Sequence, residues 1–140
     1  MSKTVPGRST KTTARSAGKA GSKRATSLLI LSSKAGSMTP AIEAKLRKSF
    51  PNSLVVEFDP KLDIDSMISP KATVIVAGGD GTIGWVVRRL ADTRHPVGIL
   101  SMGTFNNFAK SLGLPTNVTS AIRVVQTGRP RPITLGRVNG

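Results

Sequence analysis

A glycine-rich turn at residues 78–82, with the sequence Gly-Gly-Asp-Gly-Thr, constrains the fold more than any other feature of this chain. It follows residues 72–77, a short apolar run rich in β-branched side chains, which is typical of a strand buried on both faces. After the turn, apolar residues recur at helical spacing as far as Leu90. The pattern predicts a strand, a tight turn and a helix, and Thr82 is expected to cap that helix.

An Asp-Gly pair between apolar runs also favours a β-hairpin. A hairpin needs alternating polar and apolar residues on both sides, whereas the residues after Thr82 follow a helical period, so the strand-turn-helix interpretation is preferred. In that interpretation Gly78, Gly79 and Gly81 let the backbone approach a ligand, and the positive end of the helix favours a phosphate. A carboxylate is repelled there unless it holds a metal ion, orients a donor or accepts a proton. Asp80 therefore indicates chemistry rather than simple anion binding.

A second turn of the same kind follows one strand later. Residues 97–100 predict the strand, and the polar turn after it contains Gly103 and Thr104. A helical pattern begins again at about residue 105 and stops at Gly113. Because the loops after parallel strands gather at one edge of a sheet, the two Gly-Thr turns are expected to face the same ligand.

Strand and helix patterns alternate along the chain, which predicts an α/β fold with three layers and a parallel sheet between helices. The predicted strands are 27–31, 54–58, 72–77, 97–100 and 132–138. The predicted helices are 40–49, 62–68, 83–91, 105–112 and 118–127.

The two turns and their surroundings resemble the catalytic domain of the diacylglycerol kinase family, which includes bacterial lipid kinases and sphingosine kinases. Residues 78–90 resemble its nucleotide loop and next helix, and residues 96–115 resemble its second signature, usually written with a Gly-Thr-x-Asn-Asp-Phe-Ala core. Residues 30–36 weakly resemble its first-strand turn, and residues 133–140 its crossing strand. The first signature alone also fits an NAD kinase-like enzyme, an alternative that the second signature disfavours. The resemblance covers residues 27 to 140.

The resemblance implies the N-terminal, ATP-binding domain of a lipid kinase of phospholipid metabolism. Such an enzyme transfers the γ-phosphoryl group of ATP, with Mg²⁺, to the hydroxyl of a diacylglycerol-like lipid. The resemblance further implies that Asp80 is catalytic, either through Mg²⁺ as a metal ligand or as a proton acceptor. The nucleotide-binding residues that it implies are Lys34, Gly36, Gly78, Gly79, Asp80, Gly81, Thr82, Gly103, Thr104 and Asn106.

Family members are longer and have a second, β-sandwich domain, which this sequence does not contain. The chain is therefore expected to be a truncated product, a fragment or a protein that borrows the missing domain, and a non-catalytic nucleotide-binding module is kept as a second alternative. In the first turn Ser32, Ser33 and Ala35 stand where Asn, Pro and Ser are usual. Only Lys34 and Gly36 support a nucleotide contact in that turn.

The later signatures depart from the family's pattern as well. Asn107 replaces the usual Asp, which removes a carboxylate, and Phe105 occupies a position that is more often small. Phe105 either narrows the pocket or packs under the turn. Gly84 and Trp85 stand where many bacterial members have Asn and Glu. Trp85 lies off the apolar stripe of its helix, so it either contacts another element or is exposed.

Composition separates a basic tail, residues 1–26, from the domain at 27–140. The tail has no acid and no aromatic residue, and it supplies half of the formal net charge of +14. Its cations are Lys3, Arg8, Lys11, Arg15, Lys19, Lys23 and Arg24. High charge with low hydrophobicity predicts disorder. The tail is interpreted as a solvated leader, a segment that contacts anionic membrane, or an organelle transit peptide; specific nucleic-acid binding is not expected, because no aromatic stacking platform is present.

The sequence contains no cysteine, which excludes disulfides and thiolate chemistry and agrees with the cytoplasm. No stretch approaches the roughly 18 to 20 apolar residues that span a bilayer. The chain is therefore expected to be cytoplasmic and to touch membrane only peripherally. The expected partners are ATP and a lipid substrate, and a homo-oligomer stays open. His95, beside Pro96, predicts a surface loop rather than a catalytic or metal site.

Overall fold

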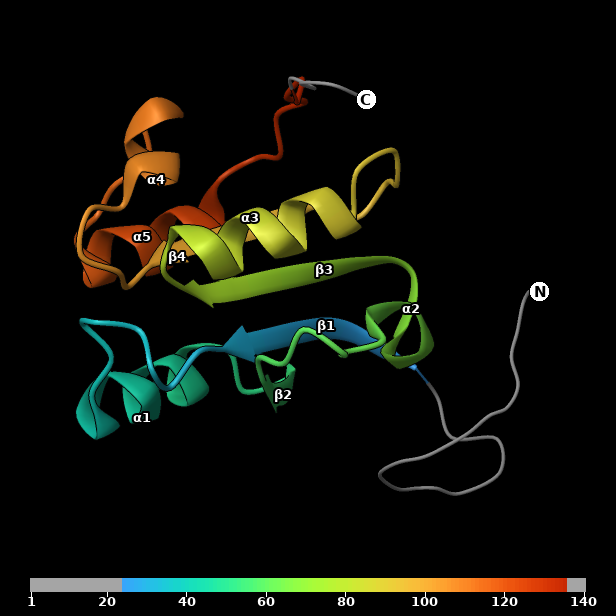
Figure 1. The fold of residues 1–140 in the computed structure, drawn as a ribbon. Coiled ribbons are helices and arrows are strands. Elements are labelled where there is room, and N and C mark those ends of the chain that lie inside the picture. The colour runs from blue at the N-terminus through green and yellow to red at the C-terminus, as the bar shows by residue number, and fades with distance from the viewer. Residues whose placement is uncertain (1–23, 136–140) are drawn as a thin grey trace.

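The computed structural model describes residues 24–135. Figure 1 shows a parallel sheet with helices on both of its faces, as the alternating pattern predicts. In chain order the elements are β1 (Ala25–Leu31), α1 (Pro40–Ser49), β2 (Leu54–Glu57), α2 (Ile64–Met67), β3 (Ile68–Gly78), α3 (Asp80–Arg89), β4 (Val97–Ser101), α4 (Asn107–Ser111) and α5 (Val118–Thr127).

The sheet has four strands in the order β2-β1-β3-β4, and every neighbouring pair is parallel. Leu29 is paired with Val55 on one side and with Ile75 on the other, and Ile75 is paired in turn with Gly98. The helix α3 over Asp80–Arg89 rules out the hairpin at residues 78–82, because the turn leads into a helix and not into a second strand.

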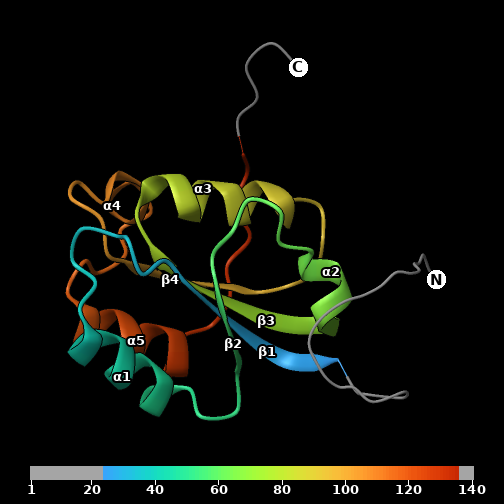
Figure 2. The same cartoon turned by 60° about the horizontal axis from the view of Figure 1, so that its bottom comes forward.

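The core has one part on each face of the sheet. Leu28 and Ile30 pack on the face that α3 covers, whereas Leu29 and Leu31 pack with α1 and α5 on the opposite face. Figure 2 shows this separation, with α1 and α5 on one side of the strands and α3 and α4 on the other. A strand that is buried on both faces cannot alternate apolar with polar residues, which explains the unbroken apolar run in β1.

Two helices begin where side-chain caps predict. Thr39 Oγ1 accepts a hydrogen bond from the Ile42 N–H at 3.1 Å, and Pro40 occupies the first turn of α1. Asn117 caps α5 in the same way, because its Oδ1 accepts from the Ser120 N–H at 3.0 Å. Both caps are local signals, which is why the ends of these helices agree with the sequence.

The expectation that Thr82 caps α3 is wrong. The helix begins at Asp80, its N-cap residue is Gly79, and no side chain caps it. Thr82 therefore lies inside the first turn, where its Cβ and Cγ2 pack against Gly78. The turn needs fewer residues than the pattern suggests, because Gly79 is extended and the helix starts directly after it.

Several other elements differ from the prediction as well. β3 begins at Ile68 rather than at residue 72, and it crosses an irregular stretch where Lys71 has a φ of 66°. α4 begins at Asn107, because Asn106 is left-handed with a φ of 56°. The predicted strand 132–138 does not form over residues 132–135, the part of it that the structure describes. Pro130 and Pro132 have no N–H to donate to a strand ladder there.

The predicted tail lies mostly outside the described residues, which begin at Arg24. β1 starts at Ala25, two residues before the predicted strand. Within the described part of the chain, no helix combines the length and the apolar character that crossing a membrane requires.

Candidate functional site

The carboxyl ends of β1 and β3 form a topological switch point. The two strands are neighbours, but the chain leaves β1 toward α1 on one face and leaves β3 toward α3 on the other. Open α/β sheets bind ligands where successive connections diverge in this way. In Figure 1 the arrows of β1 and β3 point to the left, and the loops after β1, β3 and β4 gather at that side. The predicted site residues lie in those loops, at the last residue of β3 or at the start of α3.

The turn after β3 gives α3 an open N-terminus. The N–H groups of a first helical turn have no acceptor inside the helix, and no side chain caps α3. A Cβ built on Gly81 would meet no atom within 4 Å, so the space beside this turn is free. Gly78 is different, since a Cβ there would lie 3.0 Å from Thr82 Cβ and 3.2 Å from Ser32 Cβ. Gly78 thus serves the packing of the turn, and Gly81 leaves its outer surface open.

The turns after β3 and β4 touch each other through their glycines. A Cβ built on Gly103 would lie only 2.8 Å from the Cα of Gly79, which leaves no room for any side chain. The Gly103 N–H donates to Asn106 Oδ1 at 2.9 Å, and this bond closes the second turn. Asn106 thus braces the second turn through its side chain. Gly79 and Gly103 bring the two Gly-Thr turns into backbone contact.

Asp80 connects α3 to α4. Its Oδ2 accepts a hydrogen bond from the Asn107 N–H and its Oδ1 accepts one from the Phe108 N–H, both at 2.9 Å. The carboxylate thus caps the N-terminus of α4, whose own N-cap residue, Asn106, makes no side-chain cap bond. Asp80 fixes the second turn relative to the first, a contact between residues 27 and 28 positions apart.

The loop after β1 reaches the turn after β4. A Cβ on Gly36 would lie 3.3 Å from Thr104 Oγ1, and the Ser37 N–H donates to the Met102 carbonyl at 2.7 Å. Gly36 and Thr104 are therefore neighbours, as a shared site requires. Lys34 is exposed in the same loop.

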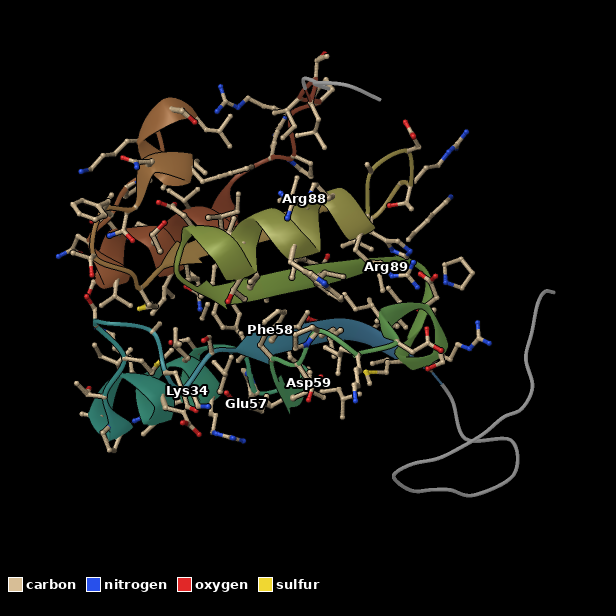
Figure 3. The ribbon with its side chains drawn as sticks, in the orientation of Figure 1. Lys34, Glu57, Phe58, Asp59, Arg88 and Arg89 are labelled. Atoms are coloured by element: carbon tan, nitrogen blue, oxygen red, sulfur yellow. The ribbon has the colours of Figure 1, made fainter. Side chains whose placement is uncertain are left out.

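Glu57 belongs to this edge of the sheet although the sequence patterns did not indicate it. The N–H and the hydroxyl of Ser33 both donate to Glu57 Oε2, each at 2.9 Å. Figure 3 shows Glu57 and Lys34 at the same end of the sheet. Ser33 replaces the proline that is usual in this turn, and its hydroxyl gives the turn a different anchor. An acid at the carboxyl end of a predicted strand was the signal that could have identified Glu57.

The aromatic residues near the site separate into packed and exposed rings. Trp85 makes an edge-to-face contact with Phe58, with ring centroids 5.4 Å apart and planes at 76°. Phe58 and Trp85 both pack against the part of the core that α3 covers. Trp85 therefore contacts another element, the first of its two interpretations. Phe105 is 68% exposed, so it does not pack under its turn.

His95 lies at the other end of the sheet, just before β4. Its Nδ1 is 2.9 Å from the carbonyl oxygen of Ala72, which gives the ring a structural partner. Across residues 24–135, no group of three or more His, Cys, Asp or Glu side chains could hold a metal ion. His95 lies in the loop before β4, as predicted, and this loop is at the end of the sheet opposite the glycine turns.

Comparison with known proteins yields one family. Residues 15–138 match the family described as the diacylglycerol kinase catalytic domain. A diacylglycerol kinase of Bacillus subtilis (strain 168) is 47% identical over 70 residues, which are 48% of this chain and 23% of that protein. A YegS-like protein of Klebsiella pneumoniae (strain 342), named as a probable lipid kinase, is 45% identical over 69 residues, again 48% and 23% of the two chains.

A solved structure shares the fold as well as the sequence. The crystal structure of a diacylglycerol kinase from Bacillus anthracis str. Sterne superposes with a TM-score of 0.60 and 27% identity. The match covers 74% of this chain and 42% of that one. The chain thus spans less than half the length of the relatives that it matches.

Proposed function

Because the chain belongs to the diacylglycerol kinase catalytic domain family, we propose that it binds ATP with Mg²⁺ across its two Gly-Thr turns. We further propose that the active form transfers the γ-phosphoryl group to the hydroxyl of a diacylglycerol-like lipid. One observation carries the proposal: the backbone contact of Gly79 with Gly103 joins the open N-terminus of α3 to the second turn. A triphosphate chain is long enough to touch both turns at once.

The residues have distinct roles in this proposal. The backbone amides at Gly79 and Gly81 face the phosphates, because neither residue has a side chain to obstruct them. Gly78 and Gly103 keep the turns close, and Asn106 braces the second. The hydroxyls of Thr82 and Thr104 donate to phosphate oxygens, and Lys34 with Gly36 borders the nucleotide from the loop after β1.

Asp80 would contact Mg²⁺ in this arrangement. Magnesium in phosphoryl-transfer sites is typically held by one or two carboxylates together with substrate phosphates, so a single carboxylate suffices. Each oxygen of Asp80 accepts one N–H and retains a further lone pair. Two backbone bonds also prevent the carboxylate from swinging toward a hydroxyl, which favours the metal contact over proton transfer. When bound, the ion neutralises phosphate charge, and the chain's own residues supply the positioning on which phosphoryl transfer mainly depends.

Two assays test the function together. Isothermal titration with ATP and Mg²⁺ measures binding, and transfer of radiolabelled phosphate to diacylglycerol measures catalysis. Binding without transfer would support the alternative of a nucleotide-binding module. Absence of ATP binding would contradict both the lipid kinase and the nucleotide-binding module. An NAD kinase-like activity has little support, since the family match extends over residues 15–138.

Replacing Gly79 with aspartate should weaken ATP binding by about tenfold or more while leaving the fold intact. Gly79 has an extended φ of −82°, and a Cβ there would make only an ordinary contact, 3.5 Å from Gly103 Cα. The variant should therefore fold, and its carboxylate would repel the phosphates. Gly79→Asn is the matched control, because it keeps the shape without the charge, and it should bind more tightly than Gly79→Asp. Titration of a folded Gly79→Asp protein that binds ATP like the parent would show that the loop assignment is wrong.

We also propose that the basic tail attracts the chain to anionic membrane. A basic segment gains about 1 kcal/mol per Lys or Arg near anionic lipid. Removing residues 1–23, which ends before β1, should lower sedimentation with phosphatidylserine vesicles but leave ATP affinity unchanged. The attraction should fade with salt, because the Debye length falls from about 10 Å at 0.1 M to about 3 Å at 1 M. Equal sedimentation of the full and shortened chains would leave the tail as a solvated leader.

A further inference from the structure

Glu57 makes a contact that the pairing of its own strand does not need. It is the last residue of β2, a strand of four residues at the edge of the sheet. The next residue, Phe58, already ties this end of β2 to β1, because its N–H donates to the Leu31 carbonyl at 2.7 Å. The Glu57 side chain instead meets the loop after β1, where its Oε2 accepts both the N–H and the hydroxyl of Ser33 at 2.9 Å. The contact therefore fixes the loop rather than the strand.

The first turn of that loop covers residues 32–35. It is closed by the Ala35 N–H, which donates to the Ser32 carbonyl at 3.1 Å, and Ser33 and Lys34 are its two central residues. Within residues 24–135, no ion pair joins Lys34 to an acid. Lys34 is also exposed, so its ammonium is available to an anion. Glu57 thus holds the neighbour of an available cation.

The other end of the loop is fixed to the turn after β4. The Ser37 N–H donates to the Met102 carbonyl at 2.7 Å, and a Cβ on Gly36 would lie 3.3 Å from Thr104 Oγ1. Lys34 lies between this anchor and the first. A loop that is held at both ends loses little further freedom when a ligand binds, which lowers the cost of binding.

We infer that Glu57 is a positioning residue, which orders the loop after β1 through Ser33 and so presents Lys34 to the phosphates of the nucleotide. This inference rests on the proposed function, because it needs the loop to border the triphosphate. Glu57 itself does not touch the ligand in this arrangement. Position 33 is the second residue of a turn, where proline is favoured because a φ of about −60° suits it. Two hydrogen bonds to one charged oxygen replace the rigidity that a proline would give there.

The sign of the effect on ATP binding separates positioning from charge. Removal of an acid near a triphosphate should strengthen binding if repulsion alone matters. Loss of the loop anchor should weaken it, so Glu57→Ala is expected to bind ATP with Mg²⁺ about tenfold more weakly, as for other hydrogen bonds to a charged acceptor. Glu57→Gln should retain most of the affinity, because one amide oxygen can accept both bonds. Isothermal titration measures all three affinities.

Ser33→Pro provides the comparison that tests the route of the effect. Proline removes both donors at position 33 and fixes the turn by its own ring, so Glu57 should no longer be needed. In the Ser33→Pro background, Glu57→Ala should leave ATP affinity unchanged. Lys34→Ala should weaken ATP binding in the parent but much less in Glu57→Ala, because the two residues act through one loop and their effects are not additive.

Two controls separate positioning from stability. Asp65→Ala removes the same charge from an exposed ion pair with Arg89, in α2 before β3, and should leave ATP affinity unchanged. The urea midpoint of Glu57→Ala should lie close to that of the parent, because Glu57 is exposed. Without nucleotide, hydrogen exchange at the Ser33 and Ala35 amides should be faster in Glu57→Ala, while the central strands exchange as in the parent. All variants are made in the full chain.

Several outcomes would overturn the inference. Unchanged or tighter ATP binding in Glu57→Ala would leave Glu57 as a surface charge. Equal weakening by Glu57→Ala in the Ser33→Pro background would mean that Glu57 acts without Ser33. A urea midpoint that falls together with the ATP affinity would assign Glu57 to the stability of the fold. Failure of the parent to bind ATP would refute the proposed function and, with it, the role of the loop in binding, although the exchange rates would still show whether Glu57 holds the loop.

Discussion

Replacing Gly103 with alanine is expected to reduce ATP affinity at least about tenfold and to destabilise the fold. The new Cβ would lie 2.8 Å from the Cα of Gly79, a distance that real Cβ contacts essentially never show. The obstacle is backbone, so no side chain can rotate away to relieve it. Overpacking of this kind costs about 1–3 kcal/mol. The two turns must separate, and a triphosphate that needs both loses part of its contacts. Titration with ATP and urea denaturation measure the two effects.

Two other glycines in the same turns supply the controls. A Cβ on Gly81 meets nothing within 4 Å, and in a helix alanine is favoured over glycine by about 1 kcal/mol, so Gly81→Ala should be as stable as the parent or more stable. Gly79→Ala makes only a 3.5 Å contact and should fold normally. If Gly103→Ala bound ATP as the parent does, the contact between the turns would not be needed for binding.

The arrangement of the sheet could be predicted from the sequence because its signals are local. The apolar runs at β1 and β3 are unbroken since both faces are covered, and Thr39 with Pro40 marks the start of α1 by side-chain capping. Alternation of strand and helix then leaves a parallel sheet as the natural solution. These rules operate within a few residues, and the elements that they predict from β1 to α5 are present.

The predicted ends of elements were wrong where a glycine or a contact with a distant residue determines them. Gly79 lets α3 begin directly after the strand, so no cap at Thr82 is needed. Asn106 adopts a left-handed conformation that delays α4, and its partner is Gly103 rather than a residue of the helix. The prolines at 130 and 132 outweighed the β-branched residues that follow them. In each case the conformational preference of a turn residue, rather than the hydrophobic pattern, determined where the element begins or whether it forms.

The glycine turns of the site could be predicted from the sequence, but the hydrogen bonds that join distant parts of the site could not. Each Gly-Thr turn is a short run of neighbouring residues after a predicted strand, so it can be recognised in the sequence. Parallel strands then bring the two turns to one edge of the sheet. The bond of Ser33 to Glu57 and the bonds of Asp80 to α4 join residues far apart in the chain. No local pattern encodes such a pair. Asp80 was singled out as an unusual charge, and the structure adds two backbone partners for it.

Asp80→Ala is the second change with a large expected effect. It removes both acceptors that hold the start of α4, and the N–H groups of Asn107 and Phe108 lose their partners. Loss of a helix cap typically costs about 1–2 kcal/mol, and the bonds here involve a charged acceptor. Hydrogen exchange at these two amides should accelerate, and the urea midpoint should fall. Asp65→Ala is the charge-matched control, because its ion pair with Arg89 is exposed and should contribute little.

The nucleotide affinity of the Asp80 variants separates a clamp from a metal contact. If Asp80 only positions α4, Asp80→Asn should restore part of the affinity, since its amide oxygen can still accept one N–H, and the loss should be the same with and without Mg²⁺. If Asp80 also contacts Mg²⁺ as proposed, Asp80→Asn should lose in EDTA only the affinity that the weakened clamp explains, and it should gain much less from Mg²⁺ than the parent does. Titrations with ATP in Mg²⁺ and in EDTA give both numbers. Because both oxygens are already held by backbone N–H groups, we expect the second result, with the carboxylate acting as a fixed charge between the two turns. An unchanged response to Mg²⁺ in Asp80→Asn would remove the metal role and leave Asp80 as a positioning residue.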